Sequence, residues 1–219
     1  VTAAMLDAST WTALYPESMD IINNSWVRTV PYLDEIPQTW DLFKDAQRQI
    51  FRNGVINVCS RGNFGDSKSR YPQYAEREEW VISVGGSNKD GYKHSSSSFG
   101  DDVDLIAPYD VDIVYTIGNN STNEYTSFSG TSAAAPHVAG VAGLMLSHID
   151  HQPSTPNNLA PDDIEFLLQR YARDIVPDLN HQEYEIGYDD LSGWGLLDAG
   201  AVMEKIDRTQ YIVKHIKKE

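Results

Sequence analysis

The chain has 219 residues, 41% of them hydrophobic and 22% charged, which is enough for one globular domain and unlike a repeat or low-complexity sequence. Its 17 Lys and Arg residues against 32 Asp and Glu give a net charge of −15. Nucleic acids and anionic membranes attract basic surfaces, so neither is expected as the main partner. A single cysteine, Cys59, excludes an intrachain disulfide.

The first half of the chain predicts helices and strands in alternation. A helix is expected over Ala3–Tyr15, a short strand over Asp20–Trp26, and an amphipathic helix over Thr39–Arg52 that ends at the following Asn-Gly pair. The β-branched runs Gly54–Cys59 and Trp80–Val84 are apolar on both faces, as in the central strands of a parallel sheet.

The second half continues this alternation. Two further strands are expected over Val103–Ala107 and Asp112–Thr116. The apolar run Ala133–Leu146 predicts a buried helix, since it is shorter than the ~20 residues that a membrane span needs. Further helices are expected to begin at Pro161 and after a capping aspartate, Asp198. Together the elements predict an α/β fold with a mostly parallel sheet between helices.

The segment Gly130–Gly140 reads G-T-S-A-A-A-P-H-V-A-G and carries the clearest chemical signal. Ser132 stands at the expected start of the apolar helix, where free backbone N–H groups and the positive end of the helix dipole converge. A hydroxyl that attacks a carbonyl group there would form an oxyanion that the same N–H groups stabilise. The simpler alternative is that Ser132 only caps the helix.

This segment resembles the active-site serine motif of the subtilisin-like serine proteases, G-T-S-x-A-x-P-H-V-A-G, and matches it at every specified position. Ala133 stands where the family often has methionine. The resemblance implies a three-layer subtilisin-like fold with a mostly parallel central sheet, in which residues 1–219 form the C-terminal portion of the catalytic domain. It also implies a serine endopeptidase that hydrolyses a peptide or protein substrate through an acyl-enzyme on Ser132.

Other segments resemble the same family in the same order. Val58–Asn63, V-C-S-R-G-N, resembles the strand and turn that end in the oxyanion-hole asparagine, which implies that Asn63 donates its amide to the tetrahedral oxyanion. Taken alone, an asparagine after a glycine would be read as a turn residue. Framework segments also match: Trp80–Gly86, Ser97–Gly100, Leu105–Pro108 and Gly193–Ala199.

Ile21–Trp26 resembles the strand that lines the substrate cleft in this family, although Val27 stands where glycine is usual. The resemblance implies that four residues border the bound peptide: Ser25, Trp26, Ser60 and Gly62.

Two members of the catalytic triad are missing from the chain. The family order is Asp, His, Ser, and the Asp and His motifs precede the strand matched by Ile21–Trp26. We therefore expect an upstream segment of the same protease to supply both residues. The sheet should then be incomplete at its N-terminal side, and this chain should be inactive alone.

The histidines of the chain are not expected to replace the missing base. His137 lies five residues after Ser132 on the same helix and is expected to be a buried hydrogen-bonding residue. The remaining histidines fall in loop, strand or helix-end contexts: His94, His148, His151, His181 and His215.

Two other functions compete with a protease. One is a catalytically inactive subtilase-like module with a binding or regulatory role, which the missing triad residues favour. The other is an α/β-hydrolase esterase, but its G-x-S-x-G motif fails because Ala134 occupies the last glycine position.

Serine protease chemistry requires no cofactor. The resemblance allows a structural calcium ion, but the aspartates between residues 101 and 112 lack the D-x-[DN]-x-[DN]-G spacing and are expected to form a solvated loop. Secretion is expected from the resemblance alone.

Overall fold

The structure is a computed structural model that describes residues 19–26, 39–68, 70, 80–118, 124–150 and 159–209. The helix predicted over Ala3–Tyr15 lies outside these residues. No helix among those described is both long and apolar enough to cross a membrane.

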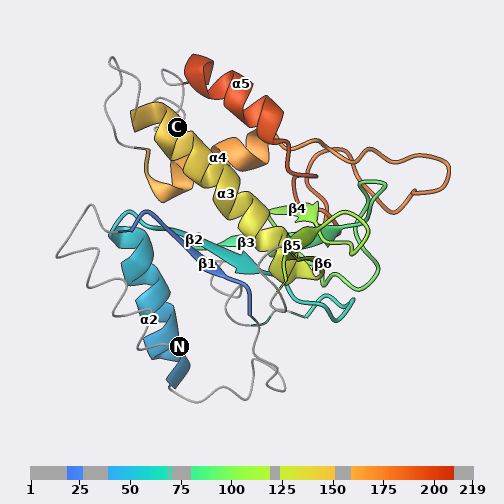
Figure 1. Cartoon of the computed structure of the whole chain (residues 1–219), viewed down its shortest axis with the longest axis horizontal. Coiled ribbons are helices and arrows are strands. Elements are labelled where there is room, and N and C mark those ends of the chain that lie inside the picture. Colours follow the sequence, from blue (N-terminus) through green and yellow to red (C-terminus); the bar gives the residue numbers. More distant parts are fainter. Residues whose placement is uncertain are drawn as a thin grey trace.

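Four parallel strands form the central sheet in the order β1-β2-β3-β4. Each overlaps a predicted strand, and their bounds are Ile21–Asn24 for β1, Ile56–Ser60 for β2, Ile82–Ser87 for β3 and Leu105–Pro108 for β4. Every residue of β2 and β3 is buried, as the apolar runs predicted. Because the strands are parallel, their carboxyl ends lie along one edge of the sheet (Figure 1).

Helices cover both faces of the sheet and complete three layers. On one face lie α3 (Thr131–Asp150), α4 (Pro161–Arg170) and α5 (Ala199–Thr209), and α3 crosses all four strands (Figure 1). Ile56 and Val58 of β2 point into the apolar core on this side. The opposite face is covered by α2 (Thr39–Arg52), whose Arg48 stacks over Trp80 next to Cys59. The predicted α/β architecture is confirmed.

Local signals set the helix limits. Gly54, the second residue after α2, adopts a φ of 80°, a left-handed conformation that ends a helix at little cost for glycine. Pro161 occupies the first turn of α4, where its missing N–H has no helical partner. Asp198 Oδ1 accepts a hydrogen bond from Ala201 N at 2.8 Å, which confirms the predicted cap of α5.

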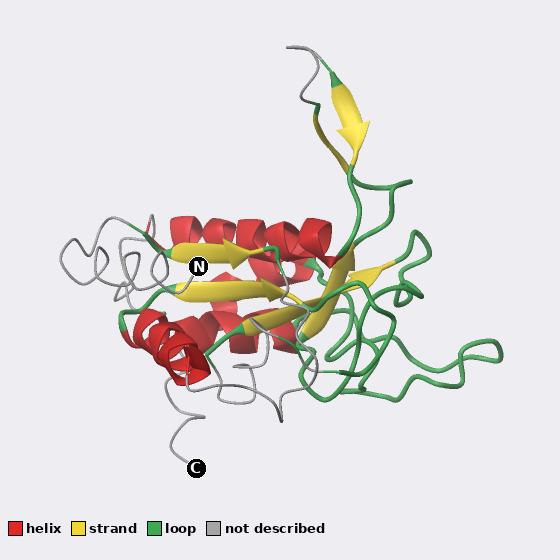
Figure 2. Ribbon diagram, turned by 90° about the horizontal axis from the view of Figure 1, so that it is seen from below, coloured by secondary structure: helices red, strands yellow, loops and turns green. Residues whose placement is uncertain are grey.

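The strand predicted over Asp112–Thr116 is shifted and does not join the main sheet. Tyr115–Ile117 forms β5, which pairs antiparallel with β6, Tyr125–Ser127, in a separate two-stranded ribbon. All residues of both strands are exposed, and the ribbon extends away from the layered body (Figure 2). The prediction is right only for Tyr115 and Thr116, because residues 111–113 form a turn, and the strand that follows pairs with β6.

The two edges of the parallel sheet differ. The outer edge of β4 is covered by the segment 193–197, which makes bridges from Gly193 to Leu105 and from Leu196 to Ile106. Among the described residues, no strand pairs with the outer edge of β1.

Candidate active site

The predicted site residues come together at the carboxyl edge of the sheet. Ser25 directly follows β1, Asn63 lies three residues after β2, and Ser132 is the second residue of α3. Hydrogen bonds join Ser25 to Ser132, and Asn63 to the neighbouring Thr131. Sites in open parallel α/β sheets commonly lie at this edge.

Ser132 lies within the first turn of α3 and is partly exposed. Its Oγ donates to the backbone carbonyl of Ser25 at 3.1 Å, and within the described residues this oxygen accepts no hydrogen bond from an N–H of α3. Its hydroxyl is therefore held at the edge of the sheet, which does not support a simple capping role. The turn before it needs glycine, because Gly130 has a φ of 104° and a Cβ there would lie 2.9 Å from Asn63 Nδ2.

Thr131 fixes the side-chain amide of Asn63. Asn63 Oδ1 accepts from Thr131 N at 2.8 Å and from Thr131 Oγ1 at 2.9 Å. Thr131 Oγ1 in turn accepts from Gly62 N at 3.0 Å, so its only proton goes to Asn63. Two donors on one oxygen determine the amide orientation, and the NH₂ group is left as the donor available to an oxyanion.

The four predicted substrate-bordering residues lie at two depths. Ser25 and Trp26 are partly exposed at the end of β1, and Trp26 Nε1 donates to Asn24 Oδ1 at 2.9 Å. Ser60 and Gly62 are buried beneath them, and Ser60 Oγ donates to the carbonyl of Trp26 at 3.4 Å. The structure thus brings these residues together, and their contact with a peptide stays a prediction.

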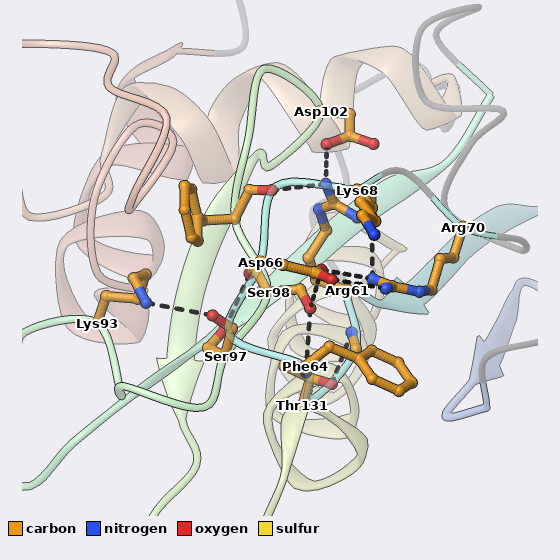
Figure 3. A network of polar contacts seen from close by, with 12 residues as sticks. Arg61, Phe64, Asp66, Lys68, Arg70, Lys93, Ser97, Ser98, Asp102 and Thr131 are labelled. Atoms are coloured by element: carbon orange, nitrogen blue, oxygen red, sulfur yellow. Dashed lines mark hydrogen bonds and ion pairs between the residues drawn. The ribbon is translucent and has the colours of Figure 1, made fainter. Parts of the chain in front are cut away.

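A buried network of charged residues that was not predicted from the sequence starts at Arg61, two residues before Asn63. The Arg61 and Asp102 side chains are fully buried and form an ion pair. The Arg61 guanidinium also donates to the carbonyl of Lys68 at 3.0 Å and to that of Phe99 at 2.6 Å (Figure 3). An arginine at the end of the buried run V-C-S was the available signal, because an arginine is rarely buried without a partner.

The expectation of a solvated aspartate loop is wrong for Asp102 and for Asp104, which is 3% exposed. Asp104 Oδ2 accepts from Ser83 N at 2.6 Å and Oδ1 from Gln169 Nε2 at 2.7 Å. Burial raises the pKa of the Asp104 carboxyl to about 7. Both aspartates are therefore interior residues whose carboxylates bind other buried groups of the chain. Among the described residues, no group of three or more His, Cys, Asp and Glu side chains is placed to hold a metal ion.

The described histidines are engaged elsewhere. His137 is exposed, which corrects the prediction that it is buried, and its Nδ1 lies 2.7 Å from the carbonyl oxygen of Ala133. His94 stacks on Tyr109, and His148 lies in the last turn of α3, at the opposite end of that helix from Ser132. The ring of His181 stacks on Tyr92. His151 and His215 lie outside the described residues.

Comparison with known proteins identifies the family. The model of the subtilase family matches residues 2–195. The chain belongs to the subtilase family. Thermitase from Thermoactinomyces vulgaris is 36% identical over 104 residues, covering 48% of this chain and 35% of thermitase. The thermostable alkaline protease of Halalkalibacterium halodurans is 34% identical over 148 residues, covering 67% of this chain and 34% of that protein. This subtilase chain thus spans about a third of the length of the curated relatives that it matches.

Solved structures confirm the fold. A lanthipeptide protease matches with a TM-score of 0.75 at 21% identity, covering 94% of this chain and 66% of that protein. The prenylagaramide maturation protease PagA matches with a TM-score of 0.72 at 23% identity, covering 94% of this chain and 68% of PagA. Together with the family match, these similarities confirm the expected subtilisin-like architecture.

Proposed function

We propose that this chain is the nucleophile-bearing part of a serine endopeptidase that hydrolyses peptide bonds in peptides or proteins. The observation that carries the proposal is the Asn63 amide, which Thr131 orients beside Ser132 with its NH₂ group available. Ser132 serves as the nucleophile. Asn63 Nδ2 and the backbone N–H of Ser132 stabilise the oxyanion.

The chemistry follows from these roles. Ser132 Oγ attacks the carbonyl carbon of the scissile bond while its proton passes to a histidine of the upstream segment. The tetrahedral intermediate collapses to an acyl-enzyme as the leaving amine takes that proton. Water then hydrolyses the ester by the same two steps and regenerates the Ser132 hydroxyl. No step requires a cofactor, and a structural calcium ion and secretion stay predictions.

Two uncovered surfaces support an upstream segment that packs beside this chain. Within the described residues, the outer edge of β1 carries no paired strand. On α3, a stripe that includes Pro136, His137, Gly140 and Leu144 is exposed, and Leu144 is 56% exposed. The strands of a parallel sheet are normally buried, and an unpaired edge can accept a further strand. A segment that carries the triad Asp and His therefore fits beside β1 and the exposed stripe of α3. We therefore expect the chain to be inactive alone.

A catalytically inactive binding module is the second candidate. It accords with the lack of a triad histidine among the described residues, within which Ser132 Oγ donates to the backbone carbonyl of Ser25. The oriented Asn63 amide weighs against it, because a binding module gains nothing from a prepared oxyanion donor.

Labelling with a fluorophosphonate probe separates the two candidates. The full-length protein should gain one adduct by intact mass, located on Ser132, and Ser132→Ala should gain none. Asn63→Ala should lower kcat about 10²–10³-fold with Ser132 still present, which is the range known for loss of one oxyanion-hole donor in subtilisin itself. If the full-length protein carries the upstream Asp and His and still does not react, the protease assignment is wrong.

A further inference from the structure

Pro136 creates a specific gap in the hydrogen bonding of α3. In an α-helix each N–H donates to the carbonyl four residues earlier, so the residue at position 136 should donate to Ser132. Proline has no N–H, and it lies within α3. The helix backbone therefore offers no such donor to the carbonyl of the proposed nucleophile.

A side chain from another element fills this gap. Ser25, which directly follows β1, donates from its Oγ to the carbonyl oxygen of Ser132 at 2.9 Å. Asn23 Nδ2 donates to the same Ser25 Oγ at 2.9 Å, so the single proton of the Ser25 hydroxyl is directed at Ser132. A hydroxyl that accepts from one partner and donates to the other replaces the missing helix bond.

The contact between the two serines runs in both directions. Ser132 Oγ donates back to the Ser25 carbonyl at 3.1 Å. The two bonds join segments 107 positions apart and fix both the backbone and the side chain of Ser132 relative to the end of β1. The other side of Ser132 is already fixed, because Thr131 is bound to Asn63.

We propose that Ser25 is a positioning residue for the nucleophile. Its hydroxyl caps the carbonyl that Pro136 deprives of a donor and so holds the first turn of α3 in register with the Asn63 amide. The inference rests on the proposed function, and it differs from a role in bordering the peptide, because it makes the effect of Ser25 depend on Pro136.

The effect of Ser25 should depend on Pro136, and substitutions at both positions can test this. Pro136→Ala restores an N–H that can donate to the Ser132 carbonyl within the helix. Ser25→Ala removes the hydroxyl that donates to the Ser132 carbonyl. It keeps the backbone carbonyl of residue 25, which accepts a hydrogen bond from the Ser132 hydroxyl. The two substitutions should therefore be coupled in a double-mutant cycle.

The first readout is the rate at which a fluorophosphonate labels Ser132 in the full-length protein. We expect Ser25→Ala to slow labelling about tenfold and Ser25→Thr, which keeps the hydroxyl, to stay within about threefold of the wild type. In the Pro136→Ala background, Ser25→Ala should change the rate less than about twofold. With a peptide substrate, kcat should fall while KM stays within about twofold. Ser127→Ala, on the exposed strand β6, is the matched control and should change nothing.

The second readout needs no activity and is the thermal unfolding midpoint of the four proteins of the cycle, which are the wild type, Ser25→Ala, Pro136→Ala and the double variant. Ser25→Ala should lower the midpoint in the wild-type background and leave it nearly unchanged beside Pro136→Ala. Equal effects of Ser25→Ala in both backgrounds, in labelling or in unfolding, would overturn the inference. A rise in KM with kcat unchanged would assign Ser25 to substrate binding instead. If the wild type fails to label, the proposed function fails, and the unfolding cycle alone decides whether Ser25 caps α3.

Discussion

The parallel sheet and the β5–β6 ribbon place similar residues in opposite surroundings. Leu105 and Ile106 of β4 are fully buried, whereas Ile117 of β5 and Tyr125 of β6 are each 76% exposed. All three segments are short and form strands, with the sequences L-I-A-P in β4, Y-T-I in β5 and Y-T-S in β6. The difference comes from α3, which packs across the sheet and makes no comparable layer over the ribbon (Figures 1 and 2).

The ribbon still has two distinct faces. In an antiparallel pair, directly opposed residues share a face, so Ile117 lies beside Tyr125 and on the same side as Tyr115. Thr116 and Thr126 form the other face. Alternation alone thus predicts a strand but not its burial, because burial depends on whether another layer packs on it. We therefore expect substitutions in the sheet region to cost far more stability than substitutions in the ribbon.

The largest effect is expected behind the site, at Arg61. Arg61→Met leaves Asp102 as a buried charge without its cation, which typically costs about 3–5 kcal/mol. The double variant Arg61→Met/Asp102→Leu removes both charges and should recover most of that loss. Urea unfolding of the full protein measures both values. Lys205→Met, at a surface pair, is the control and should cost less than about 1 kcal/mol. Equal costs of the single and double variants would contradict this account.

The next effect is expected within the apolar core, at Leu105. Its side chain is fully buried among the residues that α3, α4 and α5 pack against the sheet. Leu105→Ala removes that packing and leaves a cavity, for which about 2–5 kcal/mol is typical. The same urea titration measures the loss. A cost below about 1 kcal/mol would mean that the sheet is no better packed than the ribbon.

The strands of the sheet could be predicted well because the patterns that indicate a strand lie within a few consecutive residues. Local patterns placed all four strands to within a few residues, and the Asn-Gly pair after Arg52 gave the end of α2 as observed. The serine motif correctly placed Ser132 in the first turn of a helix. The catalytic roles of Ser132 and Asn63 stay predictions.

What the sequence did not reveal depends on distant contacts. Arg61 and Asp102 are 41 positions apart, and nothing near either residue indicates that they pair. The hydrogen bonds between Ser25 and Ser132 likewise join segments far apart in the chain. The prediction of His137 as a buried residue assumed that α3 is covered all round, whereas one face of that helix is exposed.

A smaller, pH-dependent effect is expected at Asp104. Its carboxyl has a pKa of about 7 in the folded chain, raised by burial, against about 4 for an unfolded aspartate. Between these values the folded state keeps a proton that the unfolded state loses, so stability falls as the pH rises from about 4 to about 7. Asp104→Asn should flatten this part of the profile. Unfolding free energies across that range measure it, and an unchanged slope in the variant would assign the effect to another group.

The smallest effect is expected in the ribbon, at Ile117. Its side chain is 76% exposed, so Ile117→Thr loses only the cross-strand contact with Tyr125, which is worth about 0.2–1 kcal/mol. Threonine keeps the β-branched shape that favours a strand, so the backbone pairing should survive. Urea unfolding under the conditions used for Leu105→Ala gives the direct comparison. A loss above about 2 kcal/mol would show that the ribbon is packed in solution against another surface, and the contrast between sheet and ribbon would then no longer hold.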